Sequence, residues 1–109
     1  MTNQQTAERR AWIRYPSKQE ASCRLFGQAR DEYLPVKIHD VSVTGIGLIV
    51  NSCFRSGAVL EVRVSNGPGS VSRPVLARVK QATAQPDGTW LLGCTLVSKL
   101  SDGDLQAFV

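Results

Sequence analysis

Apolar and polar residues alternate along most of this chain from residue 20 onward. In the clearest example, Leu60, Val62 and Val64 are separated by the charged residues Glu61 and Arg63. A period of two is typical of a β-strand that buries one face and exposes the other. Four runs of this kind, one short apolar run containing a glycine and one nearly continuous apolar run predict six strands. They cover residues 21–26, 34–39, 46–50, 60–64, 75–80 and 90–97.

The segments between the predicted strands have the composition of turns. Pro86-Asp87-Gly88 separates the last two strands and is typical of a tight hairpin, because proline presets φ and glycine accepts positive φ. The Asn-Gly-Pro-Gly segment at 66–69 predicts a looser connection. Six short strands joined in this way predict an all-β fold, either an antiparallel barrel or a sandwich. Closure into a barrel would also remove exposed sheet edges.

The end of the chain has a different pattern, which predicts a short α-helix. Ser101 and Asp104 have the spacing of a capping box, and Leu100 and Leu105 have the spacing of a hydrophobic staple. An apolar helix face would follow, formed by Leu105, Phe108 and Val109.

The excess positive charge of the chain is concentrated near its beginning. The 109 residues correspond to one domain and carry a net charge of +4. Residues 1–30 contain six Lys or Arg and two Glu, whereas residues 31–109 contain seven bases and seven acids. Residues 1–7 are polar and are predicted to form a disordered tail. The excess charge therefore lies near the start of the domain. The domain spans residues 8–109 and begins with an Arg-rich segment, residues 8–18.

Several classes of protein are excluded by the same composition. No apolar run approaches the roughly 20 residues of a membrane span, and the first residues lack the apolar core of a signal peptide. Cys23, Cys53 and Cys94 are widely spaced and predict reduced, buried thiols in a cytoplasmic compartment, not a disulfide framework or a zinc site. The one histidine, His39, is predicted to be an exposed strand residue. We therefore expect no enzymatic activity, no metal and no cofactor.

Two short patterns suggest a binding site for a phosphorylated guanine compound. Arg10 and Arg14 form an R-x-x-x-R pattern, and Asp40, Ser42 and Gly45 form D-x-S-x-x-G at the predicted junction of two strands. Arginines neutralise phosphates and stack on or fork to guanine. A carboxylate accepts hydrogen bonds from the donors on the other guanine edge, and glycine lets backbone N–H groups approach a ligand.

These two motifs, in this order and spacing, resemble those of the PilZ domain, a receptor for the bacterial second messenger cyclic di-GMP. The Trp-Leu-Leu-Gly-Cys run at 90–94 resembles the family's last strand. The resemblance implies a six-stranded antiparallel β-barrel with a short C-terminal α-helix in a bacterial, cytoplasmic signalling protein. It also implies that Arg9 adds a guanidinium that accompanies binding of a stacked ligand dimer. The ligand-binding residues implied are Arg9, Arg10, Arg14, Asp40, Ser42 and Gly45.

The expected mechanism is an order–disorder switch, in which ligand phosphates draw the Arg-rich segment onto the barrel and present a new surface to a protein partner or a fused domain. Two alternatives remain at this point. A small basic β-barrel could bind single-stranded nucleic acid, although seven aromatic residues and a neutral body make this the less expected function. The chain could also be a PilZ-like adaptor that acts without ligand.

Overall fold

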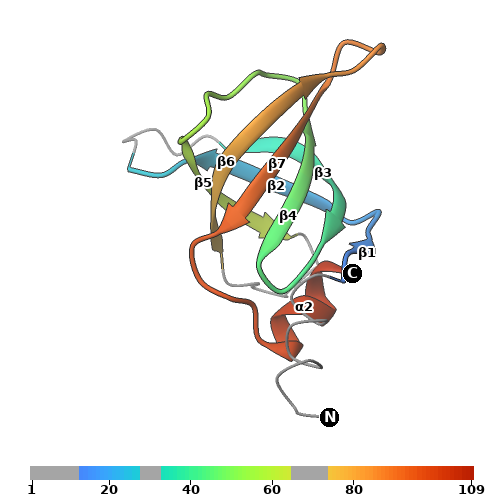
Figure 1. Cartoon of the computed structure of the whole chain (residues 1–109), viewed down its shortest axis with the longest axis vertical. Helices are drawn as coiled ribbons and strands as arrows, with labels where there is room; N and C mark the ends of the chain where they lie inside the picture. The colour runs from blue at the N-terminus through green and yellow to red at the C-terminus, as the bar shows by residue number, and fades with distance from the viewer. Residues whose placement is uncertain (1–12, 28–32, 65–73) are drawn as a thin grey trace.

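The computed structural model describes residues 13–27, 33–64 and 74–109, and its main feature is a closed antiparallel barrel (Figure 1). Six strands follow one another in the order β3-β2-β5-β6-β7-β4, and β4 pairs back onto β3 to close the ring. The all-β barrel is confirmed. The six strands are β2 (Glu20–Leu25), β3 (Leu34–Val41), β4 (Gly45–Val50), β5 (Val59–Val64), β6 (Val75–Ala84) and β7 (Trp90–Leu96).

A seventh strand, β1 (Tyr15–Pro16), was not predicted because two residues are too short to show an alternation. It pairs with the end of β3, where Tyr15 lies opposite Val41 and Pro16 lies opposite Asp40. The backbone N–H of Ser17 then donates a hydrogen bond to the His39 carbonyl over 3.1 Å. These contacts attach the segment carrying Arg14 to the strand carrying Asp40.

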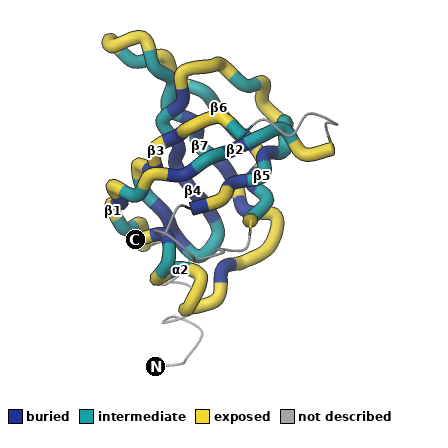
Figure 2. Tube along the Cα trace, turned by 180° about the vertical axis from the view of Figure 1, so that it is seen from behind, coloured by how far each residue is buried: buried dark blue, intermediate teal, exposed yellow. Residues whose placement is uncertain are grey.

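The barrel interior is filled by the apolar residues that the alternation predicted, and Figure 2 shows buried positions along every strand of the ring. Ile38, Leu48, Leu60 and Leu92 are all 1% exposed or less. Two positions differ from the prediction. Leu34 stands at the start of its strand and is 43% exposed, and Cys53 lies outside the strands and is exposed as well. The remaining inward-facing residues include Ala21, Cys23, Val36, Val41, Ile46, Val50, Val62, Val64, Ala77, Val79, Cys94 and Leu96.

The predicted helix is α2 (Asp102–Phe108), which lies beside β1 at one end of the barrel (Figure 1). The Oγ of Ser101 accepts a hydrogen bond from the Asp104 N–H over 3.1 Å, which confirms the predicted N-cap. Phe108 is buried, whereas Val109 is 47% exposed and does not join the apolar face. Within the described segments, no helix is long and apolar enough to span a membrane.

Two hydrogen bonds tie the end of α2 to the link between β1 and β2. The Ser17 hydroxyl donates to the Phe108 carbonyl over 2.6 Å, and the Gln19 amide donates to the Val109 carbonyl over 3.1 Å. Carbonyls at a helix end have no partner within the helix, and side chains from elsewhere in the chain can satisfy them. The helix is therefore fastened to the same short segment that positions Arg14.

Candidate functional site

The sharp connection between β3 and β4 is stabilised by Ser42. Its side chain is almost fully buried, and its Oγ accepts hydrogen bonds from the N–H groups of Gly45 (3.0 Å) and Thr44 (3.4 Å). Its own N–H donates to the Gly45 carbonyl over 2.8 Å. Ser42 thus fixes the shape of the turn from beneath, as short hydroxyl side chains commonly do. Its predicted contact with a ligand stays a prediction.

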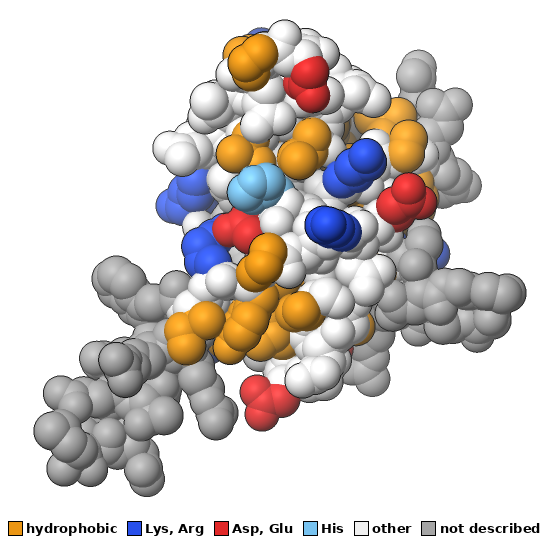
Figure 3. All heavy atoms as spheres, turned by 90° about the vertical axis from the view of Figure 1, so that its right-hand side faces the viewer, with side chains coloured by type: hydrophobic (Ala, Val, Ile, Leu, Met, Phe, Trp, Pro, Cys, Tyr) orange, Lys and Arg blue, Asp and Glu red, His pale blue; other side chains and the backbone are white. Residues whose placement is uncertain are grey.

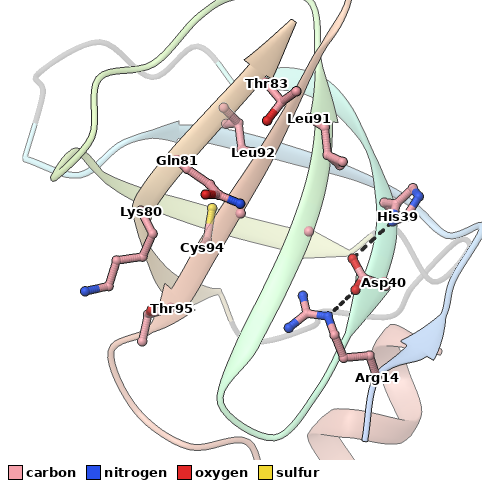
Figure 4. Close-up of a pocket in the computed structure, with 12 residues that line it drawn as sticks. Arg14, His39, Asp40, Lys80, Gln81, Thr83, Leu91, Leu92, Cys94 and Thr95 are labelled. Atoms are coloured by element: carbon pink, nitrogen blue, oxygen red, sulfur yellow. Dashed lines mark hydrogen bonds and ion pairs between the residues drawn. The ribbon is translucent and has the colours of Figure 1, made fainter. Parts of the chain in front are cut away.

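Charged and polar side chains gather on the face of the molecule that includes β3, where basic, acidic and histidine groups lie next to one another above a cluster of apolar side chains (Figure 3). Arg14 and Asp40 form an ion pair there, with Nε of the guanidinium donating to Oδ2 of the carboxylate (Figure 4). The two residues are 26 positions apart in sequence, and the pairing of β1 with β3 brings them together. The R-x-x-x-R and D-x-S-x-x-G patterns therefore meet in space at this pair.

The Arg14–Asp40 pair remains open to solvent. The Arg14 side chain is 47% exposed and the Asp40 side chain is 19% exposed. An ion pair at such a site stabilises the fold by only about 0–1 kcal/mol, because water screens it. A ligand phosphate or base can therefore exchange partners with either group at little cost.

Asp40 is ionised at neutral pH. Partial burial raises the pKa of its carboxyl, but hydrogen bonds with Arg14 and His39 outweigh burial, so the pKa lies below the usual 3.8. The His39 contact joins Nδ1 to Oδ1 over 3.1 Å. His39 itself is exposed on β3, as predicted. The site therefore presents a charged acceptor that two neighbouring side chains hold in place.

Glycines leave the space that these side chains occupy. A Cβ atom at Gly45 would lie 3.1 Å from the Cys94 carbonyl oxygen and 3.3 Å from Nη1 of Arg14. A Cβ at Gly47 would overlap with Oδ1 of Asp40. Gly45 belongs to the predicted motif. Gly47 does not, although its place two residues further along the same strand face is a signal that could have identified it.

Arg14 and Asp40 form one side of a pocket of about 390 Å³ on the outer surface of the barrel. The pocket crosses β3, β4, β7 and β6, and several of its residues were not predicted. Glycines inside strands are the local signal for some of them, because a glycine there often marks a bulge or a place where another group approaches the backbone closely. The pocket is lined by Arg14, His39, Asp40, Gly47, Lys80, Gln81, Thr83, Leu91, Leu92, Gly93, Cys94 and Thr95.

Two predicted ligand-binding residues, Arg9 and Arg10, lie outside the described residues, as does the predicted disordered tail at 1–7. The other four are described. Arg14, Asp40 and Gly45 come together at the edge of the pocket, and Ser42 supports the turn beneath them. Among the described residues, no group of three or more His, Cys, Asp or Glu side chains is arranged to hold a metal ion.

Comparison with known proteins agrees with this architecture. The family model described as PilZ domain matches residues 8–109. A similar solved structure is that of the Bacillus subtilis inhibitor of motility MotI/DgrA, with a TM-score of 0.63 at 17% sequence identity. The match covers 88% of this chain and 46% of that one, so this chain spans slightly under half the length of that protein. Comparison with curated proteins gives no significant sequence match.

Proposed function

This chain belongs to the PilZ domain family, and we propose that it is a receptor that binds cyclic di-GMP in the pocket beside Arg14 and Asp40. PilZ domains are binding and adaptor modules, and cyclic di-GMP is the ligand for which the family is known. The observation that carries the proposal is the Arg14–Asp40 pair, because it joins the two motifs at the edge of one open pocket.

The chemistry of the pair matches the two parts of this ligand. A guanine ring presents N–H donors at N1 and N2, and the ionised Asp40 carboxylate accepts such donors. The Arg14 guanidinium pairs with phosphate oxygens or stacks on a purine face. Arg14 and Asp40 pair with each other in the structure. A bound ligand would replace this exposed ion pair with its own ion pairs and hydrogen bonds to the same two side chains.

The finer parts of the proposal concern the N-terminal segment. Arg9 and Arg10 would add guanidinium groups to the same ligand, either to its phosphates or to the stack that a ligand dimer forms. Their binding would place the segment against the barrel in a new arrangement. Because β1 and the end of α2 are both fastened through residues 15–19, that arrangement would reach the helix and alter a surface offered to a protein partner.

Titration calorimetry with cyclic di-GMP tests the proposal. We expect wild-type protein to bind at low-micromolar ligand, and Arg14→Ala to bind at least about tenfold more weakly, since a charged hydrogen bond contributes roughly 1.5–3 kcal/mol. Lys99→Ala is a matched control, because it removes an exposed cation outside the pocket. Wild-type protein that binds no cyclic di-GMP would contradict the proposal, and so would an Arg14→Ala variant with unchanged affinity.

A further inference from the structure

One row of residues on the outer face of the barrel runs straight across four strands. Asp40 on β3 lies opposite Gly47 on β4, Gly47 lies opposite Gly93 on β7, and Gly93 lies opposite Gln81 on β6. The two central positions have no side chain. The row is therefore a trough with Asp40 at one end and Gln81 at the other.

Both ends of this row carry an irregularity at the same level. The register of β3 against β4 shifts between Ile38 and Asp40, and the register of β6 against β7 shifts between Val79 and Gln81. A β-bulge bends its strand and redirects a side chain, and bulges are common beside binding sites. Here each bulge immediately precedes the residue that forms an end of the trough.

The side chains of Asp40 and Gln81 lean toward each other over the glycines. A Cβ at Gly47 would overlap with Oδ1 of Asp40, and a Cβ at Gly93 would lie 3.3 Å from Cγ and 3.6 Å from Nε2 of Gln81. Figure 4 shows the Gln81 amide extending over β7 and the Asp40 carboxylate pointing toward β4 from the opposite side. The two polar groups therefore stand above the neighbouring strands β4 and β7, and neighbouring strands of a sheet are about 5 Å apart.

We propose that Gln81 is a second base-reading residue of this site, and that Asp40 and Gln81 together hold the hydrogen-bonding edge of one guanine ring over Gly47 and Gly93. This inference rests on the proposed function. Guanine presents the N1 and N2 donors beside the O6 acceptor on one edge. The Asp40 carboxylate accepts from the donors, and the Gln81 amide N–H donates to O6.

The same pair of groups disfavours adenine. Adenine has an acceptor at N1, which would face the negative charge of Asp40, and a donor at the position of O6. A site that pairs every polar group of one base leaves groups unpaired with the other, and this mismatch gives strong discrimination. Gln81 thus contributes to the choice of guanine over adenine as well as to affinity.

Calorimetry with cyclic di-GMP and cyclic di-AMP tests the inference on the full chain. We expect Gln81→Ala to weaken cyclic di-GMP binding about tenfold, the effect of one buried hydrogen bond. Gln81→Glu should weaken it further and narrow the preference for guanine, since a second carboxylate repels O6 and accepts from the adenine amino group. Gly93→Ala should also weaken binding, because its Cβ would occupy the trough 3.3 Å from Cγ of Gln81. Gln106→Ala, an exposed glutamine on α2, should match wild type.

A second measurement follows the NMR signal of the Gln81 side-chain amide. In ¹⁵N-labelled protein, the side-chain NH₂ signal that is missing from Gln81→Ala should shift when cyclic di-GMP is added. Wild-type affinity in Gln81→Ala together with an unmoved Gln81 signal would overturn the inference, while binding that still depends on Arg14 would leave the proposed function intact. A wild-type protein that binds no cyclic di-GMP would overturn both.

Discussion

At the scale of single residues, the site depends on a carboxylate that stays charged. The pKa of Asp40 is lowered, so the carboxylate and its pairing with Arg14 persist above pH 3.8 and are lost only as the pH falls through the lower folded-state value. We expect the contribution of Asp40 to cyclic di-GMP binding to be constant between pH 7 and pH 5. Asp40→Asn should weaken binding about tenfold or more across that range, because the charged acceptor is gone.

Calorimetry of wild type and Asp40→Asn at pH 7 and pH 5 checks this expectation. A drop in affinity that both proteins share would arise from another group and would leave the assignment standing. A drop in wild type that Asp40→Asn lacks would mean that Asp40 takes up a proton in this range. That result would contradict the lowered pKa and the pairing with Arg14 that explains it.

The three cysteines differ in burial, and we expect them to differ in reactivity. Burial raises the pKa of Cys23 to about 11; burial, with a smaller contribution from the nearby Cys23, raises that of Cys94 to about 12. Cys53 is exposed. Because the thiolate is the reactive form, we expect one thiol per native chain to react with DTNB at pH 8 and three to react in denaturant. Cys53→Ser should abolish the native reaction, and rapid labelling of that variant would show that the barrel opens.

At the scale of elements, α2 depends on its attachment to the link between β1 and β2. The Ser17 hydroxyl is the partner of the Phe108 carbonyl, and Ser17→Ala would leave that buried carbonyl unpaired. We expect a loss of about 1–3 kcal/mol in the stability of the helix attachment. Hydrogen exchange should accelerate in α2 while the strands of the barrel keep their protection.

Ser98→Ala is the control for this variant, since Ser98 is an exposed serine between β7 and α2. It should exchange like wild type throughout. Uniform acceleration in the barrel strands of Ser17→Ala would contradict a local role for Ser17, because it would mean that the helix and barrel unfold as one unit.

Where alternation continues without interruption, it predicts the bounds of a strand closely. β5 alternates from Leu60 to Val64, and the predicted range 60–64 agrees with the observed strand except that the strand begins at Val59. β6 extends to Ala84 instead of ending at 80, because the bulge after Val79 leaves Lys80 and Gln81 both exposed and breaks the period of two. Bulges depend on how two strands pair, and a single strand's pattern does not contain that information.

The residues of the site differ in the same way, because local motifs predict some of them and only strand pairing reveals the others. Arg14 and Asp40 belong to local motifs, and the structure places them together as those motifs suggest. Gln81 belongs to no motif. Its position in the trough follows from the pairing of β6 with β7 and of β7 with β4, which joins residues separated by long stretches of chain. Only the pairing of β4 with β7 shows that Gly47 and Gly93 are neighbours.

At the scale of the whole molecule, ligand binding should stabilise the barrel as one cooperative unit. A ligand that binds only the folded state stabilises it by about 2.7 kcal/mol at one hundred times the Kd. Since a domain near 100 residues gains roughly 4 °C per kcal/mol, we expect cyclic di-GMP at that concentration to raise the Tm by about 10 °C. Differential scanning calorimetry measures the shift.

The same calorimetry also distinguishes binding of cyclic di-GMP from binding of nucleic acid, because the two depend differently on salt concentration. Among the described residues, Arg14 stands beside Asp40 and Arg24 beside Glu61, so that part of the positive charge is already paired with acids. Cyclic di-GMP carries only two phosphates, so its stabilisation of the protein should fall much less between 0.05 M and 0.3 M salt than that of a polyanion. A single-stranded RNA held by diffuse charge would lose most of its effect over that range. Stabilisation by RNA at low salt, with none by cyclic di-GMP at either salt concentration, would contradict the proposal that this chain binds cyclic di-GMP. The Arg-rich segment would then be binding a polyanion and not a ligand of the pocket.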